Sequence, residues 1–227
     1  MSETPPSLRK AILRNSMLLG RVAAVTTVLI AGIYLNTKAQ IVASERAAEA
    51  RQLLEIMPES LHNNSLLDAS FVIDDESQLL GLREVRSGYV AKFDGQTVGV
   101  ILPATARDGY SGDIRLMVGI LADGRVAGVR VVSHRETPGL GDGIDLRKSP
   151  WILGFDNRSL MNPSNRNWTV KKDGGAFDQF TGATITPRAV VEATRKALEY
   201  ARLNRAQWYV DSLPEDPLIT PSQEPTT

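Results

Sequence analysis

The chain has 227 residues, no cysteine and a formal net charge of zero. The missing cysteine excludes disulfides, iron–sulfur clusters and thiolate metal sites within the chain, so redox chemistry would need an organic cofactor or another protein of a complex. The neutral charge gives no support for a nucleic-acid partner.

The N-terminal segment has the composition of a membrane anchor. Five bases and no acid lie between Arg9 and Lys38. Residues 17–35 hold one charge, Arg21, and as a helix would span about 28 Å of a hydrocarbon layer about 30 Å thick. We therefore predict a cytoplasmic N-terminus (1–16) and a single transmembrane helix (17–37), oriented by the positive-inside rule. A cleavable signal peptide and a buried helix are the alternatives, although helix-forming sequence follows where a cleavage site would stand.

The next segments alternate between helix, loop and strand patterns. Residues 39–57 mix apolar and charged residues as an amphipathic helix, which Pro58 ends. Residues 62–70 have the composition of a loop. Asp-Gly pairs at 94–95 and 123–124 each divide two strand-like runs, which predicts two hairpins in an antiparallel sheet of four or more strands.

The last part of the chain combines a long loop with a helix. Residues 134–155 contain many turn residues and end in a short apolar segment from Trp151 to Phe155. Thr186 as N-cap and Pro187 at the first helical position predict the start of a final helix. Its apolar residues recur at helical spacing. We expect one α+β domain (38–212) and a proline-rich disordered tail (213–227).

The sequence TGAT at residues 181–184 precedes that final helix. A turn of this composition can be purely structural, since glycine relieves the backbone and hydroxyls bond local amides. Thr184 also stands near a helix start, where free N–H groups and the helix dipole favour an anion such as phosphate. No lysine follows the glycine and no glycine-rich cradle precedes it, so a nucleotide-hydrolysing P-loop is not expected.

The pattern Asp178-x-x-Thr181-Gly182-Ala183-Thr184 resembles the D-x-x-[ST]-G-A-T signature at which a flavin transferase couples FMN to a threonine. Together with the basic N-terminus, the single span, the hairpins and the ETPGLG stretch (136–141), the chain resembles the G subunits of Rnf-type ion-translocating electron-transport complexes. It is more distantly similar to the C-type subunits of the sodium-pumping NADH:quinone reductase, whose members typically carry additional sequence between anchor and flavin domain.

The resemblance implies a covalent FMN and names its residues. Thr184 would carry the FMN as a phosphoester, and Asp178, Thr181, Gly182 and Ala183 would be recognised by the flavin transferase. The resemblance also places ETPGLG against the flavin ring, with Thr137 and Leu140 as the nearest side chains.

Three further residues are candidates for the surroundings of the cofactor. Trp151 either shields the flavin or belongs to the core. His134 could tune the ring electrostatically. Because His62 is the only other histidine, a metal site is not expected.

The functional expectation is a membrane-anchored flavoprotein that relays electrons within a multi-subunit, ion-translocating oxidoreductase. It would lie in a bacterial inner membrane with its main domain in the periplasm, bound to the other subunits of the complex. No residue is expected to act as a catalytic acid, base or nucleophile during turnover. The alternatives are the quinone-reductase subunit, a periplasmic flavin-bearing sensor or assembly protein, and a structural subunit without flavin.

Overall fold

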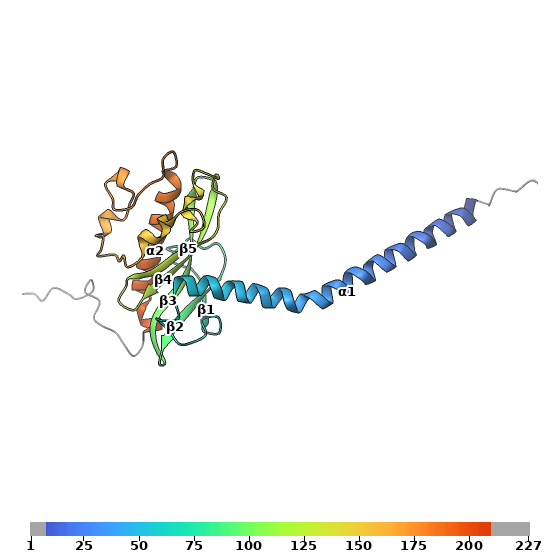
Figure 1. Ribbon diagram of the computed structural model, residues 1–227, viewed down its shortest axis with the longest axis horizontal. Coiled ribbons are helices and arrows are strands. Elements are labelled where there is room, and N and C mark those ends of the chain that lie inside the picture. The colour runs from blue at the N-terminus through green and yellow to red at the C-terminus, as the bar shows by residue number, and fades with distance from the viewer. Residues whose placement is uncertain (1–7, 210–227) are drawn as a thin grey trace, which may run out of the picture. The chain divides into compact units, whose positions relative to one another are not determined.

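The computed structural model describes residues 8–209, and the predicted tail (213–227) lies outside them. The chain divides into two compact units, Met1–Glu49 and Ala50–Thr227. The first unit holds most of helix α1 (Leu8–Ile56). The second holds a five-stranded sheet and helices α2 (Ile185–Leu203) and α3 (Arg205–Trp208) (Figure 1). This content agrees with the predicted α+β class.

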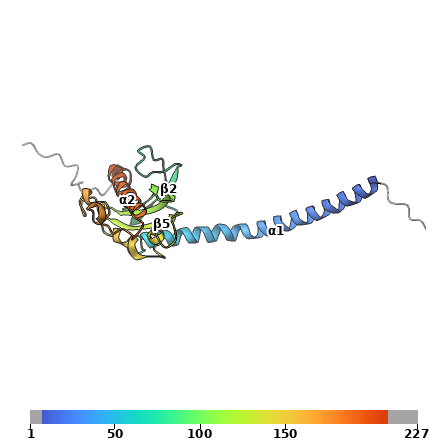
Figure 2. The ribbon, with the colours of Figure 1, turned by 90° about the horizontal axis from the view of Figure 1, so that it is seen from above.

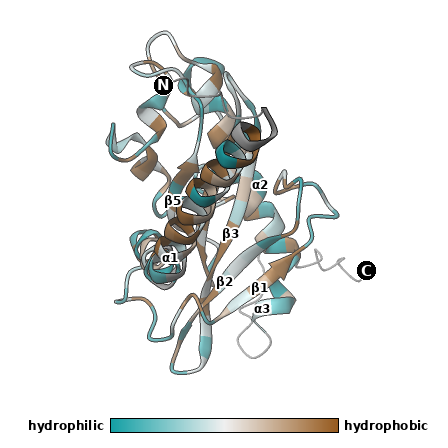
Figure 3. Cartoon of the chain, turned by 90° about the vertical axis from the view of Figure 1, so that its right-hand side faces the viewer, coloured by the Kyte–Doolittle hydropathy of each residue, from teal (hydrophilic) through white to brown (hydrophobic). Residues whose placement is uncertain are grey.

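Helix α1 contains the predicted membrane span. Its segment Ile12–Lys38 has a mean hydropathy of 1.9 and none of it is buried, so by length and composition it could cross a membrane. Hydrophobic residues are visible in brown along α1 in Figure 3. The helix continues without a break to Ile56. It ends where Pro58 was predicted to end it, since proline cannot continue the backbone hydrogen bonding.

The sheet is an antiparallel meander in the order β1-β2-β3-β4-β5. Its strands are β1 (Ser70–Ile73), β2 (Arg86–Phe93), β3 (Gln96–Gly109), β4 (Gly112–Leu121) and β5 (Val126–Ser133). Asp94 and Gly95 both have positive φ, 50° and 83°, as a two-residue hairpin turn requires. The second predicted turn differs, because residues 122–125 form a longer connection in which Gly124, but not Asp123, has positive φ. Strand β1 was not predicted.

Helix α2 covers one face of the sheet, as Figures 1 and 2 show. Its apolar stripe is fully buried as predicted and packs with residues of β3 and β4 in the larger core cluster. The opposite face carries a second cluster. Leu53 and Ile56 at the end of α1, and Met57 directly after it, pack there with Tyr89, Ala91 and Ile101. The sheet is therefore buried on both faces over its central strands.

Two paired glycines allow the end of α1 to approach this second face closely. Gly119 of β4 pairs with Gly128 of β5. A Cβ atom on Gly119 would lie 2.4 Å from Cγ2 of Ile56, and one on Gly128 would lie 3.1 Å from the Ile56 carbonyl oxygen. Any larger residue at Gly119 would displace Ile56, so these strands are shaped for the helix.

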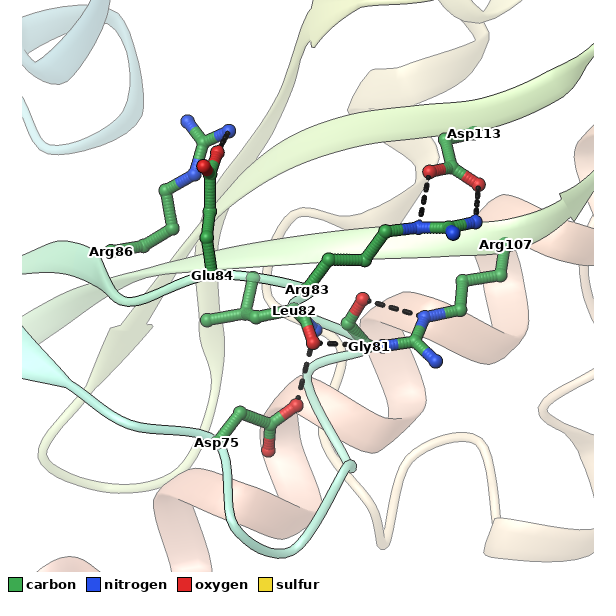
Figure 4. Close-up of polar contacts among 8 residues, drawn as sticks. All are labelled: Asp75, Gly81, Leu82, Arg83, Glu84, Arg86, Arg107 and Asp113. Atoms are coloured by element: carbon green, nitrogen blue, oxygen red, sulfur yellow. Dashed lines mark hydrogen bonds and ion pairs between the residues drawn. The ribbon is translucent and has the colours of Figure 1, made fainter.

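The segment between β1 and β2 lies beside the part of β3 that β2 does not pair with. The amide of Thr105 donates to the carbonyl of Leu80 (2.7 Å). The Arg107 guanidinium donates to the carbonyls of Gly81 (2.8 Å) and Leu82 (2.7 Å), as Figure 4 shows. These bonds hold the segment against the outer half of β3.

Four short 3-10 helices lie between β5 and α2: η1 (Asp142–Ile144), η2 (Pro150–Phe155), η3 (Asn165–Asn167) and η4 (Lys171–Asp173). The sequence predicted a long loop over residues 134–155 that ends in the apolar segment Trp151–Phe155, and η1 and η2 lie within that range. Its buried side chains Ile144, Ile152 and Phe155 belong to the main core cluster. That packing orders the region and positions the TGAT segment that follows it.

Candidate cofactor site

The TGAT segment begins with a tight turn. The Ala183 amide donates to the Phe180 carbonyl (3.2 Å), and Gly182 has a φ of +82°. A positive φ at the third residue of a four-residue turn is the type II pattern, which favours glycine there. Thr181 and Gly182 are exposed. The signature glycine is therefore required by the backbone.

Helix α2 starts directly after Thr184, which corrects the predicted helix start. Thr184 is the N-cap residue, with φ −87° and ψ −28°, and no side-chain capping bond occurs within the described part of the chain. Thr186 was predicted as the N-cap but lies inside the first turn, 1% exposed. Its hydroxyl instead donates to Oε2 of Glu136, a long-range contact that local capping rules do not consider.

Aromatic packing holds the residues just before the turn. The rings of Phe177 and Phe155 stack with centroids 4.7 Å apart, and Phe180 meets Trp151 edge-on at 5.2 Å. The Trp151 indole N–H donates to the Asp178 carbonyl oxygen (2.7 Å). Aromatic ring pairs such as these two contribute about 0.5–1.5 kcal/mol beyond the effect of the area that they bury. Trp151 is half-buried and fixes the approach of the chain to TGAT.

The ETPGLG loop meets the TGAT turn in space. The carbonyl of Thr137 accepts from the amides of Leu140 (3.1 Å) and Gly141 (3.0 Å), which curls the loop. A Cβ atom on Gly182 would lie 3.6 Å from Cδ2 of Leu140. The structure thus brings together two motifs that are about 40 residues apart.

The surface around Thr184 suits a large aromatic ligand joined through a phosphate. Leu140 is 47% exposed and Ile185 45% exposed, although both are large apolar side chains. A Cβ atom on Gly139 would meet no atom within 4 Å, so the backbone there is open. The Ile185 and Thr186 amides lack intrahelical partners, whereas Pro187 has no N–H and the Arg188 amide donates to the Thr184 carbonyl (3.3 Å). The two free amides favour an anion at this position. An FMN on the Thr184 hydroxyl therefore fits these residues.

Ion pairs flank the signature. Lys171 Nζ lies 2.6 Å from Oδ1 of the exposed Asp178. Arg188, one turn into α2, donates to both carboxylate oxygens of Asp173 at 2.8 and 3.0 Å. Because both bases are already paired with carboxylates, neither provides an unpaired cation for a phosphate.

A third ion pair, between Arg147 and Asp145, lies in the segment after ETPGLG. Side-chain hydrogen bonds from Arg147 hold the pKa of the Asp145 carboxyl below its ordinary value, while burial opposes the shift. The Arg147 amide also donates to Oδ1 of Asp145, at 2.9 Å. Asp145 thus fixes the end of η1. Its backbone amide donates to the Asp142 carbonyl and closes the turn.

The two histidines have different surroundings. His134 accepts at Nδ1 from the Glu136 amide (3.1 Å), which places it at the base of the ETPGLG loop. His62 is buried, with its ring nitrogens 3.0 and 3.1 Å from the carbonyl oxygens of Asn64 and Met57. Residues 8–209 contain no group of three or more His, Cys, Asp or Glu side chains that could hold a metal ion.

The structure also identifies residues that the sequence interpretation did not assign to this site. Glu136 and Thr186 join the loop to α2, and Phe177 and Phe180 anchor the signature. The two phenylalanines stand three residues apart around Asp178, a local pattern that could have indicated them. The Glu136–Thr186 contact spans 50 residues and has no local signal.

Comparisons with known proteins identify the domain that contains these residues. Residues 109–199 match the family model of the FMN-binding domain, and residues 1–56 match the RnfG N-terminal region. Three relatives are each named as the G subunit of an ion-translocating oxidoreductase complex. The Pseudomonas aeruginosa (strain UCBPP-PA14) protein is 53% identical over 197 residues, which is 87% of this chain and 92% of the relative. The Haemophilus influenzae (strain PittEE) protein is 48% identical over 184 residues, which is 81% of this chain and 87% of the relative. The Vibrio cholerae serotype O1 (strain M66-2) protein is 45% identical over 197 residues, which is 87% of this chain and 93% of the relative.

The sheet, α2 and the domain match define an FMN-binding protein with an N-terminal helix that could cross a membrane. Because its relatives share 45–53% identity along most of both chains, the chain belongs to the family of G subunits of ion-translocating oxidoreductase complexes. The family assignment favours this identity over the quinone-reductase subunit named as the alternative.

Proposed function

We propose that this protein is the FMN-carrying electron-transfer subunit of an ion-translocating oxidoreductase complex. The observation that carries the proposal is the half-buried Thr184 at the start of α2, next to the exposed Ile185, in a chain whose relatives are named as G subunits of such complexes. The bound FMN would supply the electron-transfer chemistry, while the protein anchors, orients and tunes it. The other subunits of the complex are its partners.

Thr184 is the residue we assign to covalent attachment. Its hydroxyl oxygen would form the new P–O bond with a flavin dinucleotide donor, whose pyrophosphate P–O bond breaks to release a nucleoside monophosphate. The hydroxyl proton passes to a base of the flavin transferase. Thr186 is unsuitable because its hydroxyl is buried and bonded to Glu136. Thr181 is exposed but lies on the turn, away from the helix start.

The remaining signature residues serve two roles in this proposal. Asp178, Thr181, Gly182 and Ala183 present Thr184 to the transferase, and three of them are exposed while Ala183 is half-buried. After attachment the phosphate would accept from the free amides at the start of α2. Thr137 and Leu140 would lie nearest the flavin ring, since Leu140 is already beside Gly182.

The proposed location is a bacterial inner membrane, crossed once by α1. The excess of bases before and within the apolar span keeps the N-terminus in the cytoplasm under the positive-inside rule. The domain after α1 would then lie in the periplasm. A covalent cofactor suits that compartment, because free FMN is scarce outside the cytoplasm and a dissociated flavin would be lost.

The test is intact-mass measurement with peptide mapping on the protein from its native membrane. We expect a gain of one FMN minus water, roughly 438 Da, at Thr184. Thr184→Val should abolish the gain. Thr181→Ser, the matched control, keeps the D-x-x-[ST]-G-A-T signature and should retain attachment at Thr184. An unmodified mass in the presence of a functional transferase would contradict the covalent assignment. Expression without a transferase should give an intact but colourless protein.

A second measurement separates electron transfer from the sensor and structural alternatives. Rapid-mixing spectroscopy on the whole complex should show the flavin of this protein being reduced and reoxidised within one turnover. A flavin that stays in one redox state while the complex turns over would contradict the electron-transfer role. Normal turnover of a complex carrying Thr184→Val would contradict it as well.

A further inference from the structure

Glu136 connects three segments that are distant in the sequence. Its side chain is buried, with the residue 4% exposed. Oε1 accepts from the Ser111 amide in the β3–β4 connection (2.8 Å), and Oε2 accepts from the Thr186 hydroxyl in the first turn of α2. Glu136 itself begins the ETPGLG loop. One carboxylate therefore joins the sheet, the loop and the helix that starts at Thr184.

Close packing around this carboxylate leaves little freedom between the loop and the helix. A Cβ atom on Gly141 would lie 2.8 Å from the Thr186 hydroxyl oxygen and 3.1 Å from Oε2 of Glu136. The loop backbone thus contacts the first turn of α2 directly. At its other side the same loop places Leu140 against Gly182. A shift at Glu136 would therefore be transmitted to the TGAT turn.

The carboxylate also places a negative charge beside the N-terminus of α2, in a setting shielded from water. A buried charge acts over a longer range than an exposed one, since the surrounding dielectric constant is lower. Reduction of a nearby cofactor adds electrons, and a negative charge opposes this addition. The charge of Glu136 would thus hold a neighbouring reduction potential down.

We propose that Glu136 is a positioning residue of the flavin site, which fixes the TGAT turn and lowers the reduction potential of the bound flavin. The inference rests on the proposed function, because it concerns the same site. It assigns to Glu136 two separable effects, one through hydrogen bonds and one through charge. Two substitutions distinguish them.

Glu136→Gln removes the charge and can keep both hydrogen bonds. Its amide oxygen accepts from the Ser111 amide, and its amide nitrogen donates to the Thr186 hydroxyl, which rotates to accept. Glu136→Ala removes both bonds and leaves the Ser111 amide and Thr186 hydroxyl without this acceptor. The control is Glu76→Gln, which removes an exposed carboxylate between β1 and β2. Glu76 lies near Tyr200, at the end of α2 that is far from Thr186.

The first experiment measures the reduction potential by spectroelectrochemical titration of the complete, flavinylated chain. We expect Glu136→Gln to be fully flavinylated with a more positive potential, and Glu76→Gln to match the wild type. An unchanged potential in Glu136→Gln would overturn the electrostatic effect. A wild-type chain that carries no flavin would instead overturn the proposed function.

The second experiment tests positioning without any flavin, by hydrogen exchange of the Ala183 amide in the unmodified complete chain. This amide closes the TGAT turn onto Phe180. Glu136→Ala should accelerate its exchange about 5- to 30-fold, while Glu136→Gln should stay within about twofold of the wild type. Thr186→Val, which removes one bond and keeps the shape, should fall between them. Equal exchange in all four chains would overturn the positioning role.

Discussion

At the residue scale, Asp156 after helix η2 is a group whose environment opposes its charge. Its Oδ1 is buried and has no hydrogen-bond partner among residues 8–209. Burial raises the pKa of the Asp156 carboxyl, while the positive charge of Arg130 opposes the rise. Because the folded-state pKa is raised, the folded chain holds this proton more tightly than the unfolded chain. The resulting stabilisation is present at low pH and is lost as the pH rises through the folded-state pKa.

We therefore predict that Asp156→Asn stabilises the domain at pH 7. The substitution removes a buried charge without changing the side-chain shape, and the gain should be about 1 kcal/mol. For a domain of this size that corresponds to an increase in Tm of about 2–4 °C. Thermal unfolding between pH 4 and pH 8 checks it, and the gain should shrink towards low pH. Asp108→Asn, at an exposed carboxylate, should change little. An unchanged Tm for Asp156→Asn at pH 7 would contradict the argument.

At the scale of elements, the segment between β1 and β2 is held to β3 largely by Arg107. Its guanidinium donates to two backbone carbonyls of the segment, those of Gly81 and Leu82. Arg83 instead forms an exposed side-chain ion pair with Asp113 (3.0 Å), as Figure 4 shows. We predict that Arg107→Ala loosens the segment by about 1 kcal/mol, since two backbone acceptors lose their donor. Hydrogen exchange of the Thr105 amide, which bonds Leu80, should accelerate about fivefold.

Arg83→Ala is the matched control for this prediction. It removes an arginine that lies in the β1–β2 segment itself and pairs with Asp113 of β4. This ion pair is exposed, and such pairs contribute about 0–1 kcal/mol. The Thr105 amide should then exchange within about twofold of the wild-type rate. If both variants exchange alike, the bonds to Gly81 and Leu82 do not hold the segment.

At the scale of the whole molecule, the end of α1 belongs to the core of the domain. Leu53, Ile56 and Met57 are each at most 2% exposed, and burying such side chains contributes about 1.5–3 kcal/mol each. Their sum is comparable to the total stability of a typical domain, about 5–15 kcal/mol. We predict that a chain beginning at residue 39 folds cooperatively, whereas one beginning at residue 59 aggregates or loses its thermal transition.

Calorimetry and size-exclusion chromatography of the two shortened chains check this prediction. Ile56→Ala in the complete chain isolates the packing effect and should cost about 2–5 kcal/mol. A chain from residue 59 with an undiminished Tm would show that the second core cluster is dispensable.

Several features of the site could be predicted from local sequence, and others could not. The type II turn follows from Gly182, and the stripe of α2 follows from helical spacing. The helix start was predicted two residues late because Thr186 and Pro187 form a good local capping pattern. The buried Glu136 carboxylate engages Thr186 from outside the helix. A contact over 50 residues outweighs a local preference of about 1 kcal/mol.

The sequence by itself determined the α+β class, the apolar N-terminal helix, the first hairpin turn and the resemblance that names Thr184. These depend on residue spacing and on backbone preferences, which are local properties of the chain. Only the tertiary structure decided that the ETPGLG loop meets the TGAT turn, that Glu136 joins loop to helix, and that Gly119 and Gly128 receive the end of α1. The physical reason is that these contacts arise from packing between distant segments, which no local pattern encodes.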